Sequence, residues 1–533
     1  MKIIIADPLP DSAVELLETE GWTVDSRSGR SSQELTQDVV DADALIVRSA
    51  TKVTRELITA ASQLRVIGRA GTGIDNVDVV AASKRGILVL NAPGANSISV
   101  AEHTFALILA AARSIALADA QMKTGKWEKK TLRGSELRGK TLGILGLGRI
   151  GREVVRRAKA FDMDILTHDP FIATAVADEI GTALVSLEIL AERSDFITLH
   201  IPLTNNTKEI INANLLARCR RNAWIINTAR GDLINETDLA KAITEERIGG
   251  AALDVYQEEP TNNTSLISSN RVVATPHIAA STTEAQELVG LEAATAIRDY
   301  LQTGVVRNAV NYPSVGPEEF KRIHPYLILA ERMGSLLAQL AGSPVDRIGI
   351  RYYGALTDGD NEMLVCAAIV GLFRAILSSS ISLVNARTVA EQRGLEVIES
   401  RSTRARNFTN LVSLKTNTVD GEYWAEGAVF EPGKPRIVRL NDVEVEVALE
   451  GTLVVIRNDD QPGVIGEVGS ILGRHGINIA TLALGRGNAS ATGVVRIGDK
   501  PSSPHTSPPA VSQAVLDEIR SISAVQSVSL VRL

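Results

Sequence analysis

Cysteine is scarce in this chain, because Cys219 and Cys366 are the only two among 533 residues and lie far apart in the sequence. This argues against a disulfide scaffold or a cysteine-rich zinc site and fits a reducing compartment. A large excess of one charge is also lacking, since the formal net charge is −7 and the pI is near 5.7. That balance argues against a general nucleic-acid binder, although it leaves room for a local basic pocket.

Apolar runs of membrane-spanning length are missing as well. The longest candidate, Phe105 to Leu117, is interrupted by Arg113 and is too short to cross a bilayer. The N-terminal sequence MKIIIADPLP begins a predicted strand at once, with no signal peptide before it. We therefore expect a cytoplasmic protein with no membrane, nucleic-acid or metal partner.

The most informative motif is TLGILGLGRIGREVVRRAKAFDMDILTHDP, from Thr141 to Pro170. It is typical of a strand, a glycine turn, a helix and a second strand. Gly146 permits the tight turn, Gly148 lets the backbone approach a pyrophosphate at the helix N-terminus, and Gly151 lets the helix pack closely on the sheet. Asp169 can accept hydrogen bonds from both adenosine ribose hydroxyls and would repel a 2′-phosphate. The motif predicts an NAD site; the alternative is a glycine-rich turn without a ligand.

Short apolar strands alternate with helical patterns through the first three hundred residues, which predicts α/β units with parallel sheets. The expected strands are IIIA at 3, ALIV at 44, LRVIG at 64 and ILVLN at 87, and then DFITLH at 195, AWIINTA at 223, GAALDV at 250 and RVVATPH at 271. Long helices are expected at Ser97 to Leu117, with Ser97 as N-cap, and at 282–304. VRNAVN at 306 indicates a return to the first domain.

The prolines and glycine of YPSVGPEE, at 312–319, predict a domain boundary. After it we expect helices at Ile328 to Gln339 and Met363 to Leu377, and then strands around Ser402 to Val429. From 451 the pattern is strand, loop, helix and strand, with a last strand in SAVQSVSLVRL. A Pro/Ser-rich loop at 499–509 interrupts this segment.

Polar residues that follow predicted strands are the candidates for chemistry, because ligands of α/β sheets lie beyond the carboxyl ends of the strands. Arg230 follows IINTA, Glu259 follows LDVYQE and His277 follows VVATP. Oxidation of an alcohol needs a base for the hydroxyl proton and a cation for the substrate, and a carboxylate on the second imidazole nitrogen fixes the tautomer. From the residues alone, Glu258 competes with Glu259, and His103, His168 and His200 compete with His277.

The order GLGRIG, HDP, NTARG, LDVYQEEP and TPHIAAST resembles the D-isomer-specific 2-hydroxyacid dehydrogenases over residues 1 to 312. The resemblance implies that Arg230, Glu259 and His277 are catalytic, and so favours Glu259 over Glu258. It also implies an NAD site with the following members: Thr72, Gly146, Gly148, Arg149, Ile150, Gly151, Asp169, Ile201, Thr228, Ala229, Asp254 and Ala280. For Ile201 only a backbone contact is implied.

Within that family the first domain and MKTGKWEKK at 122 resemble the phosphoglycerate dehydrogenases. Two strand-end arginines suit a phosphate, because the guanidinium fork matches its oxygens. The resemblance implies that Arg48, Arg69 and Asn96 hold 3-phosphoglycerate and that Lys129 of a partner subunit adds a charge. Otherwise these arginines are surface charges.

The C-terminal VVIRNDDQPGVIGEVGSILGRHGINIATLAL resembles an ACT domain. The resemblance implies a ferredoxin-like fold, a serine effector bound by Asn458, Asp460 and Asn478, and a homotetramer. The alternative is an ACT fold that serves only for assembly. Apart from the Arg48 and Arg69 pair, the dehydrogenase motifs also suit an enzyme for an unphosphorylated acid. A further alternative is a non-catalytic NAD-sensing regulator.

The sequence therefore predicts an α/β protein with four domains, and the resemblance implies an NAD-dependent phosphoglycerate dehydrogenase activity. A discontinuous flavodoxin-like substrate domain would take 1–98 and 286–312, and a Rossmann NAD-binding domain would take 99–285. An α+β intervening domain, with a possible allosteric substrate site, would take 318–447. The ACT regulatory domain would take 450–533.

Overall fold

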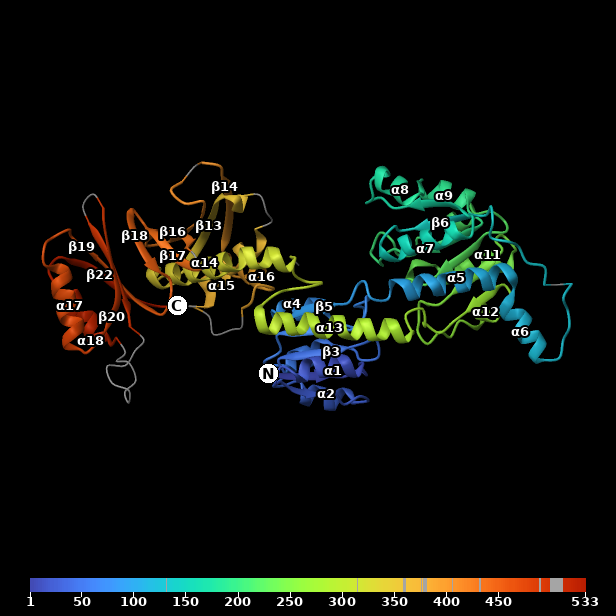
Figure 1. Ribbon diagram of the computed structural model, residues 1–533, viewed down its shortest axis with the longest axis horizontal. Coiled ribbons are helices and arrows are strands. Elements are labelled where there is room, and N and C mark those ends of the chain that lie inside the picture. Colours follow the sequence, from blue (N-terminus) through green and yellow to red (C-terminus); the bar gives the residue numbers. More distant parts are fainter. Residues whose placement is uncertain are drawn as a thin grey trace.

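The computed structural model describes residues 1–130, 132–313, 315–357, 361–374, 376, 381–404, 406–430, 433–487, 490–498 and 511–533. Four sheets follow one another along an elongated molecule (Figure 1). We call the parts built on them the N-terminal unit, the glycine-turn unit, the third unit and the C-terminal unit. The loop predicted at 499–509 lies outside the described residues.

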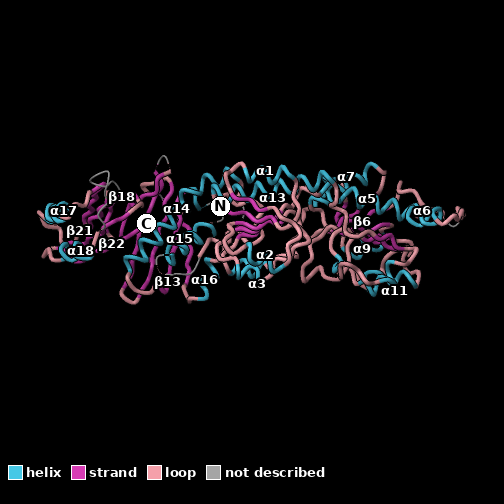
Figure 2. Tube along the Cα trace, turned by 90° about the horizontal axis from the view of Figure 1, so that it is seen from below, coloured by secondary structure: helices cyan, strands magenta, loops and turns pink. Residues whose placement is uncertain are grey.

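The N-terminal unit is a five-stranded parallel sheet in the order β2-β1-β3-β4-β5, the flavodoxin-like order. Its strands are β1 (Lys2–Ile5), β2 (Thr23–Asp25), β3 (Ala44–Val47), β4 (Val66–Arg69) and β5 (Leu88–Asn91). Its helices are α1 (Asp11–Glu18), α2 (Ser32–Asp38), α3 (Arg55–Ala60), α4 (Val79–Lys84) and α13 (Thr283–Thr303). The helices lie on both faces of the strands (Figure 2). The four predicted strands are confirmed, and the helix predicted at 282–304 is α13.

α13 brings a distant part of the chain onto this sheet. It packs on α1 and β4, and a Cβ at Gly68 would lie 2.5 Å from Ile297 Cδ1, so glycine permits the close approach. The chain after α13 then pairs with β5, through a bridge between Leu90 and Ala309. The segment at 306 therefore lies against the N-terminal sheet.

The glycine-turn unit has a seven-stranded parallel sheet in the order β12-β11-β10-β9-β6-β7-β8, the doubly wound Rossmann arrangement. Its strands are β6 (Thr141–Leu145), β7 (Asp164–His168), β8 (Ala183–Leu184), β9 (Phe196–Leu199), β10 (Trp224–Asn227), β11 (Gly250–Leu253) and β12 (Val272–Ala274). Its helices include α7 (Arg149–Ala160), α8 (Thr174–Ile180), α9 (Leu187–Arg193), α10 (Ala213–Leu216), η1 (Gly231–Leu233), α11 (Glu236–Thr244) and α12 (Thr264–Ile267). The strands predicted at 195, 223, 250 and 271 are confirmed.

The helix predicted from Ser97 to Leu117 is two helices, α5 (Ser97–Arg113) and α6 (Ile115–Lys123). Ser114 between them adopts φ +51, a left-handed conformation that ends α5. The N-cap is Asn96, so the prediction of Ser97 was wrong by one residue. Among the described helices, none has by itself the length and apolar character of a membrane span; only α5 and α6 taken together do, and they are bent by 67°.

Two hydroxyls join the helices that begin where the chain passes between these two units. α5 follows β5, α13 follows β12, and Ser99 Oγ lies 2.8 Å from Thr282 Oγ1. Both crossings are therefore side by side, as Figure 1 also shows for α5 and α13.

The third unit packs α14 (Pro317–Ala341) and α15 (Glu362–Arg374) against a six-stranded mixed sheet. The strands are β13 (Val345–Gly354), β14 (Glu396–Ser402), β15 (Asn410–Thr418), β16 (Gly421–Phe430), β17 (Lys434–Leu440) and β18 (Val443–Ala448), with η2 (Ala355–Thr357) and α16 (Ala386–Gln392) between them. Both predicted helices and the later strands are present, and the predicted end at Leu377 lies outside the described residues. β13 was not predicted, because it lies between the two predicted helices in a stretch where only helices were expected.

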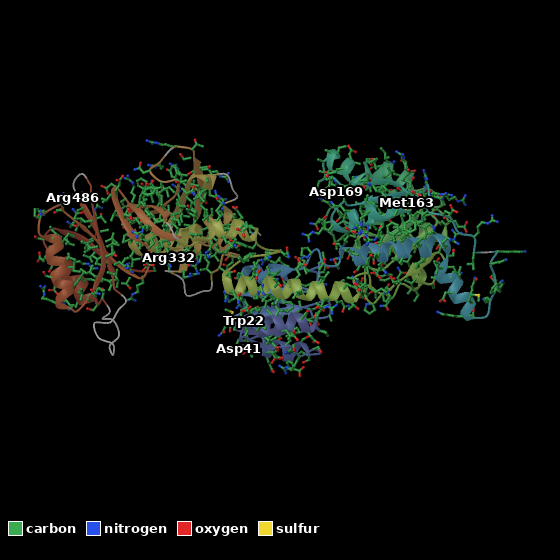
Figure 3. The ribbon with its side chains drawn as sticks, in the orientation of Figure 1. Trp22, Asp41, Met163, Asp169, Arg332 and Arg486 are labelled. Atoms are coloured by element: carbon green, nitrogen blue, oxygen red, sulfur yellow. The ribbon has the colours of Figure 1, made fainter. Side chains whose placement is uncertain are left out.

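The C-terminal unit is β19 (Thr452–Asn458), α17 (Val464–Arg474), β20 (Ile479–Arg486), β21 (Ala491–Ile497), α18 (Gln513–Arg520) and β22 (Val525–Arg532). Its antiparallel sheet, β20-β21-β19-β22, has both helices on one face, the ferredoxin-like arrangement (Figure 1). The other face turns toward α14. Gln339 exchanges two hydrogen bonds with the backbone of Arg532, and Arg332, labelled in Figure 3, donates to Leu449 O at 2.5 Å.

Candidate active site

The glycine turn has the geometry that its sequence predicts. Gly146 adopts φ +92, and a Cβ there would lie 2.5 Å from His200 O. A Cβ at Gly151 would lie 2.1 Å from Gly146 O, so α7 sits directly on the turn. A Cβ at Gly148 would meet no atom within 4 Å, and this open space lies at the N-terminus of a twelve-residue helix. The turn therefore leaves room for a phosphate where helix amides can bind it.

Asp169 lies beside this turn, at the end of β7. Its Oδ2 accepts from Leu147 N at 2.8 Å and its Oδ1 from Phe171 N at 2.9 Å, which fixes the carboxylate and leaves lone pairs on both oxygens. Figure 3 labels Met163 and Asp169 at the two ends of β7, with Asp169 toward the middle of the molecule. Adenosine ribose hydroxyls suit these lone pairs. The residues present therefore fit NAD.

The other predicted cofactor contacts surround the same edge of the sheet. Ile201 Cγ2 would lie 2.7 Å from a Cβ at Gly146, so Ile201 closes the back of the turn. Arg149 begins α7 and reaches Gly94 of the N-terminal unit, where a Cβ would lie 2.3 Å from its Nη1. The remaining members are placed as follows: Ile150 in the first turn of α7, Thr228 and Ala229 after β10, and Ala280 after β12.

His277 and Glu259 form a hydrogen-bonded pair, with 2.7 Å between His277 Nδ1 and Glu259 Oε2. Glu259 Oε1 also accepts from Tyr256 N at 3.1 Å. The side chains are 50% and 38% exposed, so the pair is open to a ligand. Because Nδ1 faces the carboxylate, Nε2 of His277 is left to exchange a proton with a bound molecule.

A buried carboxylate holds the segment that carries His277. Asp254, fully buried, accepts from Thr275 Oγ1 at 2.6 Å, Ile278 N at 2.9 Å and Ala279 N at 2.8 Å. His103 Nε2 lies behind it, 3.3 Å from Asp254 Oδ1. These bonds stabilise the left-handed conformation of His277, φ +54. Asp254, predicted as a cofactor contact, thus has its side chain committed to this loop.

A second buried carboxylate holds the segment that carries Glu259. Glu236, at the start of α11 and 8% exposed, accepts from Gln257 N at 2.8 Å and from Asn263 Nδ2 at 2.9 Å. It therefore joins the two ends of the segment on either side of Glu259. Neither Glu236 nor the role of His103 was predicted from the sequence, because each acts on groups that only the fold brings near.

Arg230 shares a cavity of about 860 Å³ with Glu259 and His277. The residue follows β10, and its neighbour Gly231 has no room for a side chain, since a Cβ would lie 1.9 Å from Tyr256 C. The opposite wall comes from the N-terminal unit and includes Lys52 and Asp75. The structure thus brings the three predicted catalytic residues together in an interdomain cavity.

The predicted substrate residues end neighbouring strands of the N-terminal sheet. Arg48 follows β3 and donates to Pro8 O at 3.2 Å, and Arg69 ends β4. Arg69 Nε is buried without a hydrogen-bond partner among the described residues. Burial, with the nearby Arg230 guanidinium, lowers the pKa of Arg69. Asn96 Oδ1 accepts from Thr72 Oγ1 at 3.0 Å nearby. An anion placed here would satisfy Arg69.

The competing histidines lie elsewhere. His103 is behind Asp254, and His168 Nδ1 lies 3.1 Å from Val185 O. His200 Nε2 contacts Thr198 Oγ1 at 3.0 Å, and burial lowers the pKa of His200 to about 3. None of the three lines the cavity that holds Arg230, as far as the described residues define it. Glu258 is exposed and is not the residue bonded to His277.

The remaining predicted residues are not brought to the cavity by one chain. Lys129 is in the exposed segment after α6, at the far end of the glycine-turn unit (Figure 1). In the C-terminal unit, Asn458 ends β19 and is 2% exposed, and Asp460 pairs with Arg486 at 3.3 Å. Asn478 precedes β20 at the opposite end of the sheet. The three predicted effector residues therefore do not lie together within one C-terminal unit. No cluster of potential metal ligands occurs among the described residues.

Three family models match the chain. Residues 105–279 match the NAD-binding domain of D-isomer specific 2-hydroxyacid dehydrogenases, 322–441 match the D-3-phosphoglycerate dehydrogenase intervening domain, and 452–504 match the ACT domain. These matches confirm the resemblance stated from the motifs and the predicted fold class.

Full-length relatives support the same family. The chain is 41% identical over 534 residues, covering all of both chains, to a D-3-phosphoglycerate dehydrogenase of Methanocaldococcus jannaschii. It is 42% identical to that of Synechocystis, covering 91% of this chain and 88% of the relative. Among solved structures, NAD-bound 3-phosphoglycerate dehydrogenase of Entamoeba histolytica aligns with a TM-score of 0.50 at 32% identity, covering 58% of this chain and 99% of that one.

Proposed function

Because the chain belongs to the D-3-phosphoglycerate dehydrogenase family, we propose that it catalyses the NAD-dependent oxidation of 3-phospho-D-glycerate to 3-phosphooxypyruvate, the first step of the phosphorylated pathway of L-serine biosynthesis. The observation that carries the proposal is the cavity in which the His277 and Glu259 pair faces Arg230. An alcohol needs such a base and such a cation for oxidation.

His277 is the base in this proposal. With its Nδ1 hydrogen donated to Glu259, its Nε2 accepts the proton of the substrate hydroxyl, and the carboxylate stabilises the imidazolium that results. NAD bound at the glycine turn supplies the acceptor for the hydride that leaves the same carbon. Arg230 holds the carboxylate and polarises the oxygen on the carbinol carbon.

The two remaining arginines account for the phosphate. Arg48 and Arg69 end adjacent strands, and the buried Nε of Arg69, which has no hydrogen-bond partner among the described residues, would be satisfied by a phosphate oxygen. Asn96 adds a polar group beside Thr72. A cavity between two units also allows closure over the substrate, which excludes water during hydride transfer.

The test is NADH formation by the purified full chain, with 3-phosphoglycerate and with glycerate as substrates. We expect the phosphorylated acid to be strongly preferred and the preference to be lost in the Arg48→Gln/Arg69→Gln double variant. Equal use of both acids by the wild type would identify a dehydrogenase for an unphosphorylated acid. NAD binding without turnover of either acid would identify a non-catalytic regulator.

Regulation, assembly and location belong to the same proposal. Serine would bind between two C-terminal units, because Asn458 and Asp460 lie at the opposite end of the sheet from Asn478. Such pairing, with contacts between the catalytic units that bring Lys129 to a partner, gives a homotetramer in the cytoplasm. Serine added to the NADH assay, and the mass in solution with and without serine, test these points.

A further inference from the structure

An ion pair crosses the cavity between the N-terminal unit and the glycine-turn unit. Arg230, after β10 of the glycine-turn unit, donates from Nε to Asp75 Oδ2 at 3.0 Å, and Asp75 lies in the loop after β4 of the N-terminal unit. The two residues are 155 positions apart in the sequence. The contact therefore joins opposite walls of the site in which the proposed substrate would bind.

The hydrogen bonds of Arg230 leave one edge of its guanidinium available. Nε faces Asp75, and Nη1 donates to Ala229 O at 2.6 Å. Nη2 lies over Gly73, where a Cβ would be only 2.2 Å away, so the glycine makes room for it. A guanidinium carries five N–H groups, and the described residues accept hydrogen bonds from two of them, so both hydrogens of Nη2 and one of Nη1 remain for an anion. Asp75 and Gly73 thus fix the orientation in which Arg230 presents this edge.

The charge of Asp75 also opposes anions in the same place. Arg48 and Arg69 have no ion-pair partner among the described residues. Asp75, through its ion pair with Arg230, is therefore the carboxylate that neutralises part of the positive charge of these three arginines. Asp7, the other acid near them, is committed to Arg48 N, Thr51 N and Thr51 Oγ1. The side chain of Asp75 is 68% exposed, and an ion pair in contact with water is weak enough for a ligand to replace it.

We propose that Asp75 is a positioning residue for Arg230 that also competes with the carboxylate of the substrate. In the empty cavity it holds the guanidinium across the two units. When an anion binds, the negative charge of Asp75 weakens the binding of that anion in the ground state. Its hydrogen bond also keeps Arg230 oriented for the reaction. This inference rests on the proposed function only for the identity of the substrate, because competition applies to any small anion at the arginines.

The first experiment needs no turnover. Sulfate is titrated into the full chain without cofactor, and binding is followed by the rise in melting temperature. We expect Asp75→Asn to bind sulfate about two- to fivefold more tightly than the wild type, since an exposed charge contributes modestly. Asp75→Glu, which keeps the charge, should bind as the wild type does. Equal or weaker binding by Asp75→Asn overturns the proposal.

A matched control and a double-variant cycle locate the effect. Asp41 is an exposed acid of the same unit, paired with Lys2 on its far side (Figure 3), and Asp41→Asn should leave sulfate binding unchanged. In an Arg230→Gln background, the gain from Asp75→Asn should fall below about twofold, because the two residues act as a pair. A full gain in that background, or an equal gain from Asp41→Asn, contradicts the pairing.

Kinetics then separate positioning from mere structural support. We expect Asp75→Asn to lower both kcat and KM for 3-phosphoglycerate. KM should fall because the substrate binds more tightly in the ground state, and kcat should fall because Arg230 is less well oriented in the transition state. A raised KM overturns the competition. If the wild type shows no turnover of any acid, the proposed function fails, whereas the sulfate titration still decides the role of Asp75.

Discussion

Replacing Glu259 with glutamine keeps the shape of the side chain and removes its charge from the bond to His277. The two side chains are 2.7 Å apart, and a hydrogen bond to a charged group contributes about 1.5–3 kcal/mol. The lower part of that range, about 1.5–2 kcal/mol, applies here because the side chains are 38% and 50% exposed. The Glu259 carboxylate stabilises His277 more strongly as the imidazole takes up the proton. Loss of its charge therefore raises the free-energy barrier of the chemical step. At 1.36 kcal/mol per decade, kcat should fall about 10- to 30-fold.

The assay is NADH formation at saturating substrates, with KM for the acid and Kd for NADH measured beside it. Both should stay within about twofold of the wild type, because an interaction made mainly in the transition state leaves ground-state binding unchanged. The matched control is Glu258→Gln, a change of the same kind at the exposed neighbouring residue. A wild-type kcat in Glu259→Gln, or an equal loss in Glu258→Gln, would refute the assignment of Glu259.

Three further changes test the cofactor site, a packing constraint and a surface charge network. Asp169→Ser removes the charge that repels a 2′-phosphate, so kcat/KM with NADP should rise at least about tenfold relative to NAD, and an unchanged ratio would count against this role. Gly231→Ala would place a Cβ 1.9 Å from Tyr256 C and should lower the free energy of unfolding by about 1–3 kcal/mol in urea titration; an unaltered midpoint would contradict the packing. The side-chain hydrogen bond from Arg27 holds the pKa of Asp25 well below its usual value. Because this pKa is lower in the folded state, Asp25 stabilises the fold above about pH 4 and ceases to do so as the pH falls, so the deficit of Asp25→Asn in urea should shrink between pH 7 and pH 3, and a constant deficit would argue against it.

The central strands and the glycine turn were predictable because each is specified locally. A strand such as β10 is a short apolar run between turns, and Gly151 is required by a contact with Gly146 O inside the same strand-turn-helix segment. The short edge strand β2 was not predictable. β2 has only three residues, none of them fully buried, so its sequence lacks the apolar run that marks the central strands.

The parts of the site that the sequence did not reveal depend on contacts between distant segments. Glu258 and Glu259 are equivalent by residue type, and only the approach of His277 distinguishes them in the fold. Asp75 was passed over although it is three residues from Thr72, because its partner belongs to the other unit. The break at Ser114 likewise has no glycine or proline to announce it.

The hydroxyl contact between Ser99 and Thr282 has a mechanical consequence for the catalytic half of the molecule. Because both chain crossings lie side by side there, a hinge motion between the N-terminal unit and the glycine-turn unit would turn about this contact. His277 is five residues from Thr282 and hence would move little in such a motion. The arginines at the ends of β3 and β4 move as one piece with their sheet. Such a motion would therefore bring an acid held by these arginines toward His277, while the imidazole itself would move little.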